Sequence, residues 1–112
     1  MHHDTVAHSP MMKALLVPLS AALWLAAPAH ANPELAKQKL CMGCHAVDKK
    51  QIGPAFKDVA ARYAGQKDAA AKLADKIVQG GGGVWGAVPM PPNPRVSPEE
   101  AKQLANWVLT TK

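Results

Sequence analysis

Cysteine is scarce in this chain, which limits the ways in which its fold can be stabilised. Only two of the 112 residues are cysteines, Cys41 and Cys44. A disulfide between such close neighbours would close almost no loop, so it would constrain the unfolded chain very little. A domain of about 80 residues, which is the part that remains after the leader predicted below, rarely gains more than about 3–5 kcal/mol from its apolar core alone. A metal or a cofactor is therefore expected to organise the core.

The chain also lacks a hydrophobic run long enough to cross a membrane. Residues 14–27 are mostly apolar, but they are fewer than the about 20 that a spanning helix needs, and Pro18 interrupts them. A basic start, Met12-Lys13, precedes this run, and the small-residue sequence Ala29-His30-Ala31 follows it. This pattern is typical of a cleavable secretory signal rather than of a membrane anchor.

Cleavage after Ala31 divides the chain into two parts. Residues 1–31 are predicted to be a leader with a cleavable signal peptide, and translation starts at Met1, Met11 or Met12. Residues 32–112 are predicted to form one domain of 81 residues. This domain holds 12 Lys and Arg against 7 Asp and Glu, a net charge of +5. Because the basic residues are scattered and the chain is exported, we expect docking to an acidic partner rather than nucleic-acid binding.

Capping residues and hydrophobic spacing predict four helices in this domain. The first begins at Asn32-Pro33 and carries Cys41 near its end. The others cover Ala55–Tyr63, run from a cap at Asp68 to about Gln79, and start at the capping box Ser97-Pro98-Glu99-Glu100. The residues expected to face the core are Phe56, Val59, Ala60, Tyr63, Leu73, Ile77, Ala101, Leu104, Ala105 and Val108, with Trp107 beside them. No alternation typical of strands is present, so the fold class is predicted to be all-α, with one long loop.

The two cysteines belong to a short pattern with a specific chemistry, Cys41-Met42-Gly43-Cys44-His45. Cys-x-x-Cys-His is typical of c-type haem attachment, in which each thiol forms a thioether with a haem vinyl group. The histidine is then carried under the iron as its proximal ligand. A structural zinc site would need four protein ligands, and a thioredoxin-like redox pair would need a βαβ context that this chain lacks. We therefore predict one covalently bound haem c, whose iron alternates between Fe2+ and Fe3+.

The second axial ligand follows by elimination. Four of the five histidines precede the expected cleavage, so His45 is the single histidine of residues 32–112. Met42 lies inside the Cys-x-x-Cys loop on the proximal side, which leaves Met90 for the other side of the iron. A lone methionine is more often core filling than a ligand. Prolines flank Met90 on both sides, however, and they lower the entropic cost of holding its sulfur at the iron. We predict that His45 and Met90 ligate the metal.

Five stretches of residues 32–112 resemble one known family. They are Cys41–His45, Ile52-Gly53-Pro54-Ala55, Val84-Trp85-Gly86, Pro89-Met90-Pro91-Pro92-Asn93 and Trp107-Val108-Leu109. In order and in spacing they are similar to bacterial class I cytochromes c of the c-551/c-552 type. The resemblance implies the small class I cytochrome c fold, with about four helices around one covalently bound haem whose edge is exposed.

The resemblance also implies roles for four further residues around the haem. Pro54 would offer its backbone carbonyl to the Nδ1–H of His45 and so fix the ring. Trp85 would donate its indole N–H to a haem propionate, or pack in the core, or both. Lys76 matches a basic position near the same propionate, although a lysine on a helix is more safely interpreted as a solvated side chain. Asn93 matches a residue whose side chain lies near the methionine sulfur, and its alternative role is to form a turn.

Two loop features receive a plainer interpretation. Gly80–Gly83 permit close backbone approach to the haem or simply end the third helix, and we favour the helix stop. Residues 93–96 are one residue longer than is usual in this group, which affects local loop geometry and leaves the ligand set intact.

Together these features predict a one-haem electron carrier of a respiratory chain rather than an enzyme. A His/Met-ligated iron has no open position for substrate, and no acid–base pair accompanies it. A peroxidase or gas-binding sensor would need a displaceable sixth ligand, and a non-haem helical interaction module would carry no covalent haem. The expected partners are redox proteins, with a membrane cytochrome complex as donor and a terminal reductase or oxidase as acceptor. A periplasmic monomer without stable membrane insertion is expected after cleavage, and weak dimerisation stays open.

Overall fold

The computed structural model describes residues 32–112. The expected leader, residues 1–31, lies outside the described residues. The described part forms four α-helices and one 3₁₀ helix, namely α1 (Pro33–Gln38), η1 (Cys41–Gly43), α2 (Phe56–Tyr63), α3 (Ala69–Gln79) and α4 (Pro98–Thr110). Its β-type pairing is limited to a single bridge between Gly81 and Met90. The all-α class is therefore confirmed. Within residues 32–112, no helix has the length and apolar character needed to cross a membrane.

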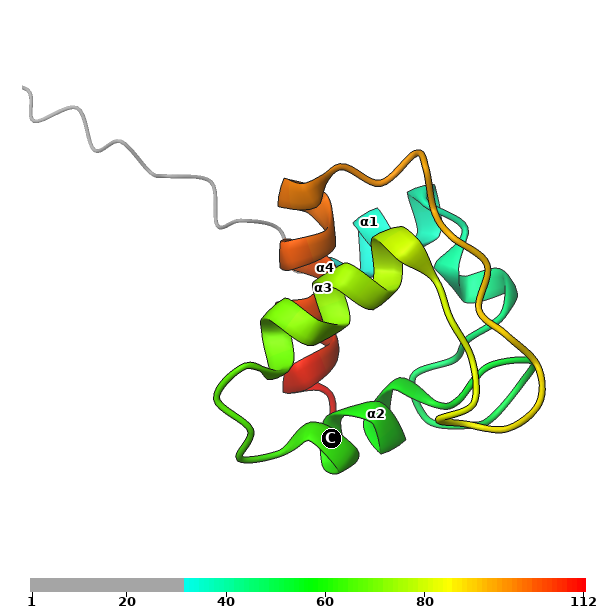
Figure 1. Cartoon of the computed structure of the whole chain (residues 1–112), viewed down its shortest axis with the longest axis vertical. Coiled ribbons are helices and arrows are strands. Elements are labelled where there is room, and N and C mark those ends of the chain that lie inside the picture. Colours follow the sequence, from blue (N-terminus) through cyan, green and yellow to red (C-terminus); the bar gives the residue numbers. More distant parts are fainter. Residues whose placement is uncertain (1–31) are drawn as a thin grey trace, which may run out of the picture.

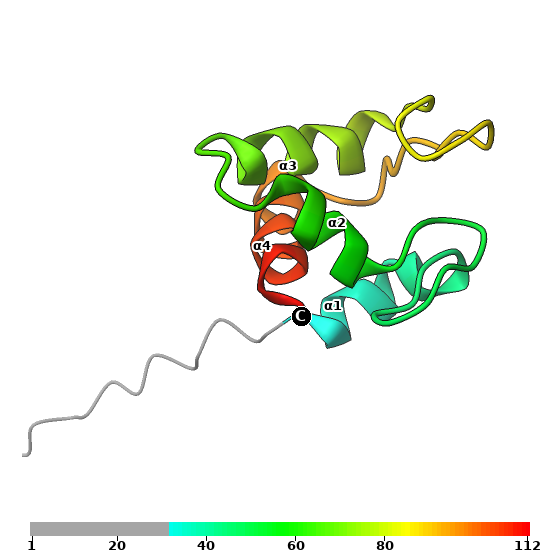
Figure 2. The same ribbon diagram turned by 90° about the horizontal axis from the view of Figure 1, so that it is seen from below.

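Helix α4 lies at the centre of the fold and contacts each of the other α-helices. Figure 1 shows α3 crossing in front of it, and Figure 2 shows α2 beside it. Its buried residues recur three or four positions apart and form one apolar stripe: Ala101, Leu104, Ala105 and Val108. Trp107 is half-buried beside this stripe. The predicted inner face of the last helix is confirmed.

The core consists of two small clusters that α4 connects. In one, Leu104 and Ala101 pack with Ala36 of α1 and with Val96. In the other, Val108 packs with Phe56 and Val59 of α2. Burial of a large apolar side chain contributes about 1.5–3 kcal/mol. Because both clusters include residues of α4, packing against α4 holds the other helices in place.

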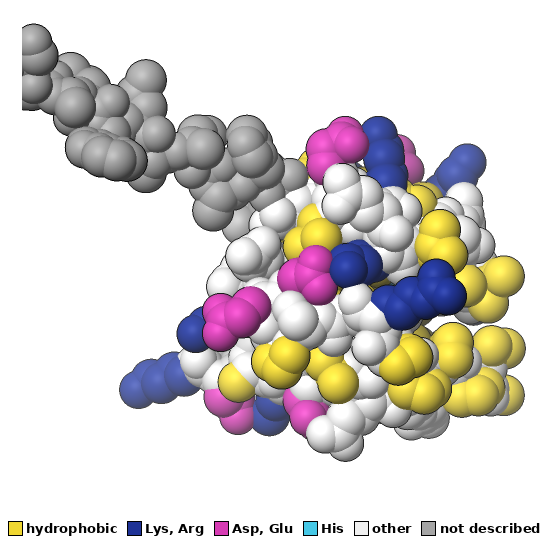
Figure 3. Space-filling model, turned by 90° about the horizontal axis from the view of Figure 1, so that it is seen from above, with side chains coloured by type: hydrophobic (Ala, Val, Ile, Leu, Met, Phe, Trp, Pro, Cys, Tyr) yellow, Lys and Arg dark blue, Asp and Glu magenta, His cyan; other side chains and the backbone are white. Residues whose placement is uncertain are grey.

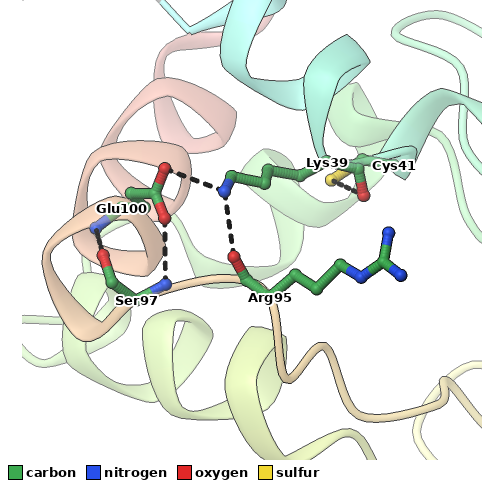
Figure 4. A network of polar contacts seen from close by, with 5 residues as sticks. All are labelled: Lys39, Cys41, Arg95, Ser97 and Glu100. Carbon is green, nitrogen blue, oxygen red and sulfur yellow. Dashed lines mark hydrogen bonds and ion pairs between the residues drawn. The ribbon is translucent and has the colours of Figure 1, made fainter.

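A polar network joins the start of α4 to the end of α1 (Figure 4). The Ser97 hydroxyl accepts a hydrogen bond from the Glu100 N–H at 3.1 Å, and Glu100 Oε1 accepts one from the Ser97 N–H at 3.0 Å. The predicted capping box is thereby confirmed. Glu100 Oε2 also lies 3.1 Å from Lys39 Nζ, which donates to the Arg95 carbonyl at 2.9 Å. The network therefore holds the segment before Cys41 against the loop that leads into α4.

Helix α1 is shorter than predicted, and the expectation that Cys41 lies near its end was wrong. The helix ends at Gln38, with Lys39 as its C-cap. Leu40 then adopts the left-handed conformation, with φ of 64°, and Cys41 begins the separate helix η1. A left-handed conformation costs a residue other than glycine about 1–2 kcal/mol. Nothing in the local sequence indicates such a turn, because Leu40 continues the hydrophobic spacing of the helix.

Two residues predicted as N-caps occupy the cap position but do not form the capping hydrogen bond. Asn32 precedes α1 and Asp68 precedes α3, but neither side chain bonds to the first turn of its helix. The Asn32 side chain donates instead to the Gln103 carbonyl of α4 at 3.3 Å. Asp68 forms an ion pair with Lys72 at 3.3 Å. Both side chains thus have partners that compete with the helix end, although the helix positions themselves agree with the prediction.

Two loops extend from the same side of the helices. One runs from Cys44 to Ala55 and leads into α2, which begins at Phe56, one residue later than predicted. The other runs from Gly80 at the end of α3 to Ser97 at the start of α4. In Figure 2 the second loop (yellow to orange) and the first (cyan to green) lie one above the other beside the helices. Their separation creates the space in which the site lies.

Candidate functional site

A cavity of about 470 Å³ lies between the two loops and the helices. The loops contribute residues 50–54 and 81–91 to its wall. The helices contribute mainly apolar side chains, including Phe56, Val59, Leu73, Ile77, Leu104, Trp107 and Val108. Cofactor pockets have volumes of about 300–1,000 Å³ and are mostly apolar, so the cavity has the size and lining of such a pocket.

Four large hydrophobic side chains of the cavity wall are unusually exposed. Ile52 and Val88 are 62% and 65% exposed, and Val84 and Trp85 are 41% and 38% exposed. Figure 3 shows hydrophobic side chains gathered at the end of the molecule where the loops lie, with basic side chains beside them. Contiguous exposed apolar surface of this kind marks a binding groove.

Helix η1 turns both thiols and the histidine toward the cavity. The Cys41 carbonyl accepts hydrogen bonds from the Cys44 N–H at 3.2 Å and from the His45 N–H at 3.0 Å. This tight turn brings all three side chains to the cavity wall. Both cysteines are half-buried, and no disulfide joins them. Burial raises the pKa of the Cys41 thiol.

The imidazole of His45 is held in one orientation. Its Nδ1 lies 2.8 Å from the Pro54 carbonyl oxygen. Because a carbonyl oxygen only accepts hydrogen bonds, Nδ1 carries the proton and the lone pair of Nε2 stays free. The ring also stacks on Phe56, with centroids 4.9 Å apart and planes 21° apart. Phe56 and Trp107 in turn form a T-shaped pair, with ring centroids 5.3 Å apart. This orientation leaves Nε2 available to a metal ion.

Gly53 makes this orientation sterically possible, a role that the sequence analysis missed. A Cβ atom on Gly53 would lie 2.5 Å from Cε1 and 2.8 Å from Nδ1 of His45. The Gly53 N–H donates to the Cys44 carbonyl at 2.7 Å, which closes the loop under the ring. The only signal in the sequence was that Gly53 directly precedes Pro54.

Met90 reaches the same cavity from the other loop. It lines the cavity wall and is half-buried. Its backbone forms two hydrogen bonds with Gly81, of 2.8 and 2.9 Å, which fix its place in the loop. Met42, the other methionine of residues 32–112, is not part of the cavity wall and packs against both core clusters. The cavity therefore contains one thioether, that of Met90.

Of the other predicted site residues, Trp85 and Lys76 lie in the cavity wall and Asn93 does not. Trp85 and Lys76 line the cavity, and the Arg62 guanidinium lies 5.1 Å from the centroid of the Trp85 ring, within cation–π range. Sequence reasoning had assigned Arg62 no role. Asn93 lies outside the cavity lining, and its Nδ2 donates to the Ile77 carbonyl at the end of α3 at 2.8 Å.

The donor set of the cavity suits a haem better than a bare metal ion. Two cysteines, one histidine with a free Nε2 and one methionine line a mostly apolar space. Within residues 32–112, no three His, Cys, Asp or Glu side chains are grouped so that they could hold a metal ion. Two basic side chains of the wall, Lys50 and Lys76, suit the carboxylates of haem propionates. The residues present therefore fit a haem attached through its vinyl groups.

Comparisons with known proteins agree with this chemistry. Residues 31–112 match the family model for cytochrome c. Cytochrome c-552 of Hydrogenobacter thermophilus is 56% identical over 102 residues, which cover 91% of this chain and 100% of that protein. Cytochrome c-551 of Pseudomonas aeruginosa is 57% identical over 82 residues, or 72% of this chain and 78% of that protein.

Solved structures show the same similarity in three dimensions. The crystal structure of wild-type Nitrosomonas europaea cytochrome c552 has a TM-score of 0.69 and 56% sequence identity, and the match covers 70% of this chain and 98% of that chain. The class 1 cytochrome MtoD from Sideroxydans lithotrophicus has a TM-score of 0.62 and 35% identity, over 72% of this chain and 92% of that chain. The chain therefore belongs to the cytochrome c family, as a class I member of the c-551/c-552 type, and carries a covalently bound c-type haem.

Proposed function

We propose that residues 32–112 transfer single electrons through one haem that is attached to Cys41 and Cys44 and ligated by His45 and Met90. Membership of the cytochrome c family makes the chain a small haem-containing electron carrier. The ligand assignment is supported by one observation above all. His45 and Met90 belong to two different loops, and both line the same cavity.

Each of these residues has a distinct task toward the haem. The two thiols of η1 would anchor it, and the Nε2 lone pair of His45 would bind the iron on one side. The hydrogen bond from Nδ1 to the Pro54 carbonyl keeps that lone pair directed into the cavity and strengthens its donation. When bound, the haem supplies an iron that accepts and releases one electron. A thioether is a soft, weak donor, so Met90 would favour the reduced state and raise the reduction potential.

The residues around the cavity suit a carrier better than an enzyme. With a ligand on each side, the iron has no position left for a substrate. The single histidine of the cavity has its Nδ1–H engaged with Pro54, so it offers no free acid–base group. Electron exchange would then need little rearrangement of the protein. A peroxidase or gas sensor would require Met90 to leave the iron.

The location and the partners of the carrier follow from its leader and charge. We propose that residues 1–31 are removed and that the mature protein works in the periplasm as a monomer. Redox proteins are its partners, as family membership implies. A membrane cytochrome complex as donor and a terminal reductase or oxidase as acceptor are the proposed pair. Its net charge of +5 favours brief docking to acidic faces of such proteins.

The test is expression with the cytochrome c maturation machinery, followed by intact mass, an absorption spectrum and a redox titration. The mass should equal that of residues 32–112 plus one haem. The ferric protein should show the methionine-to-iron charge-transfer band at the red edge of the visible spectrum. Met90→Leu should abolish this band and lower the reduction potential, because leucine has about the volume of methionine but no sulfur to bind the iron.

Met42→Leu is the matched control, since Met42 lies outside the cavity wall. It should leave the band and the potential unchanged. A band that survives Met90→Leu would contradict the ligand assignment. Rapid peroxide turnover by the unmodified protein would favour the enzyme instead.

A further inference from the structure

The loop that carries Met90 is fastened to the end of α3. Gly81 and Met90 exchange two backbone hydrogen bonds, from the Gly81 N–H at 2.9 Å and from the Met90 N–H at 2.8 Å. Asn93 adds two more, from its N–H to the Val78 carbonyl at 3.1 Å and from Nδ2 to the Ile77 carbonyl at 2.8 Å. The last carbonyls of a helix lack partners within the helix. The Met90 loop therefore satisfies the C-terminal end of α3, and that end determines where the loop lies.

Gly80 is the point of closest approach between helix and loop. It has φ of 72°, so it ends α3 in a conformation that favours glycine. A Cβ atom on Gly80 would collide with the Met90 carbonyl oxygen and would lie 2.7 Å from the Pro92 nitrogen and 2.8 Å from the Pro91 carbonyl carbon. All three atoms belong to the backbone of a proline-rich segment, which has little freedom to move. The simple helix stop expected for Gly80–Gly83 is thus only part of the role of Gly80.

We propose that Gly80 is a positioning residue for Met90. Because Gly80 has no side chain, residues 90–92 lie directly against the end of α3. This contact determines how far the Met90 sulfur reaches into the cavity. The inference rests on the proposed function, in which Met90 is an axial ligand. A thioether is a weak ligand, so its occupancy at the iron depends on how well the protein holds it in place.

A second glycine, outside this loop, controls for backbone strain. Gly65 follows α2 with φ of 77°, and a Cβ atom placed on it meets nothing within 4 Å. It lies outside the cavity wall. Alanine is strained at both Gly80 and Gly65, because both have positive φ. Only at Gly80 does it also push against the Met90 segment. The comparison of Gly80→Ala with Gly65→Ala therefore controls for the loss of stability that positive φ causes.

The experiment compares the two holoproteins by the ferric charge-transfer band of methionine ligation. The band is recorded as the pH is raised until it disappears. Gly80→Ala should lose the band at a pH lower by about one unit or more, which corresponds to about a tenfold change in the equilibrium between the methionine-ligated form and the form without this ligand. Its ferrous form should also bind carbon monoxide more readily than the unmodified protein. Gly65→Ala should keep the band over the original pH range, although both variants unfold at lower denaturant concentration.

Three outcomes would overturn the inference. Equal shifts of the band in both variants would show that a general loss of stability, and not the contact, releases Met90, and an unchanged band in Gly80→Ala would show that the contact does not position Met90. If Gly80→Ala yields no holoprotein, Asn93→Ala takes its place, because it removes the bond to Ile77 without adding an atom. It too must lose the band at lower pH, and an unchanged band overturns the inference. Met90→Leu separates failure of the proposed function from failure of this inference. If Met90→Leu keeps the band, Met90 is not the ligand and the proposed function fails. If Met90→Leu loses the band while Gly80→Ala keeps it, only the role of Gly80 fails.

Discussion

The imidazole of His45 is confined from three directions by single residues. Pro54 accepts its Nδ1–H at 2.8 Å, Phe56 stacks on one face at 4.9 Å between centroids, and the backbone of Gly53 lies against the ring. A ligating histidine whose outer nitrogen is bonded keeps one tautomer and one ring orientation. Gly53 is therefore as necessary to this arrangement as the carbonyl of Pro54, because no other residue leaves room for the ring.

Gly53→Ala should disturb the histidine directly. The new methyl group would lie within 3.0 Å of Cε1, Nδ1 and Nε2 of His45, so the ring or the loop must shift. Overpacking of this kind costs about 1–3 kcal/mol. We expect the free energy of unfolding in denaturant to fall by that amount, and the reduction potential to rise because the bond to Pro54 weakens.

The control for this substitution is Gly43→Ala. Gly43 lies in the Cys-x-x-Cys-His segment that carries His45, and a Cβ atom on Gly43 meets nothing within 4 Å. Its effect on the free energy of unfolding should stay within about 0.5 kcal/mol. Equal losses in the two variants would mean that Gly53 matters only for the flexibility of the chain and not for the histidine.

Sequence and geometry contribute differently to knowledge of the site. The pattern Cys41–His45 and the elimination of other methionines indicate residues that line one cavity, because both depend on chemical type. The roles of Gly53 and Gly80 depend on where distant backbone and rings lie after folding. A glycine in the sequence is equally compatible with a turn, a helix stop or a close approach. No sequence pattern distinguishes these three uses.

At the scale of the helices, local signals proved more predictable than tertiary ones. The capping box at Ser97 requires only residues three positions apart, and it forms as expected. The caps expected of Asn32 and Asp68 do not form: Asn32 bonds instead to the distant Gln103, whereas Asp68 pairs with Lys72, four residues further along the chain. The left-handed turn at Leu40 is imposed by the path that the chain takes from α1 to η1, and hydrophobic spacing does not reveal it.

The start of α4 should respond to acid through Glu100. The backbone N–H of Ser97, and after it the Lys39 ammonium, hold the pKa of Glu100 below its ordinary value. A carboxylate with a lowered folded-state pKa stabilises the fold above its unfolded pKa, about 4.3 for glutamate, and loses that contribution as the pH falls through the folded value. The free energy of unfolding should therefore decline below about pH 4.3 by more in the unmodified protein than in Glu100→Gln.

Glu99→Gln is the matched control for this pH dependence. Glu99 lies in the same first turn of α4 but makes no side-chain hydrogen bond or ion pair within residues 32–112. Denaturant unfolding at several pH values would compare the three proteins. If Glu100→Gln keeps the full acid dependence of the unmodified protein, the link from α4 through Glu100 to Lys39 has no part in it.

At the scale of the whole molecule, charge and apolar surface meet at the cavity. The described chain has a net charge of +5, and Lys50 and Lys76 belong to the cavity wall beside the exposed side chains of Ile52 and Val88. Apolar surface at the mouth permits close approach of a partner, and the surrounding positive charge attracts an acidic one. The position of the charges, and not only their sum, should therefore determine the rate of electron exchange.

This arrangement predicts how salt and single charges affect the rate with an anionic oxidant. Oxidation of the ferrous protein by ferricyanide, followed by stopped flow, should slow several-fold as ionic strength rises from about 0.01 M to about 0.5 M, because screening shortens the range of attraction. Lys50→Gln and Lys76→Gln should each slow the reaction at low salt more than Lys102→Gln, whose residue lies exposed on α4 away from the cavity wall. Each substitution removes one positive charge, so a difference between them reports location alone. Equal effects would attribute the attraction to net charge, and a rate independent of salt would remove electrostatics from the encounter altogether.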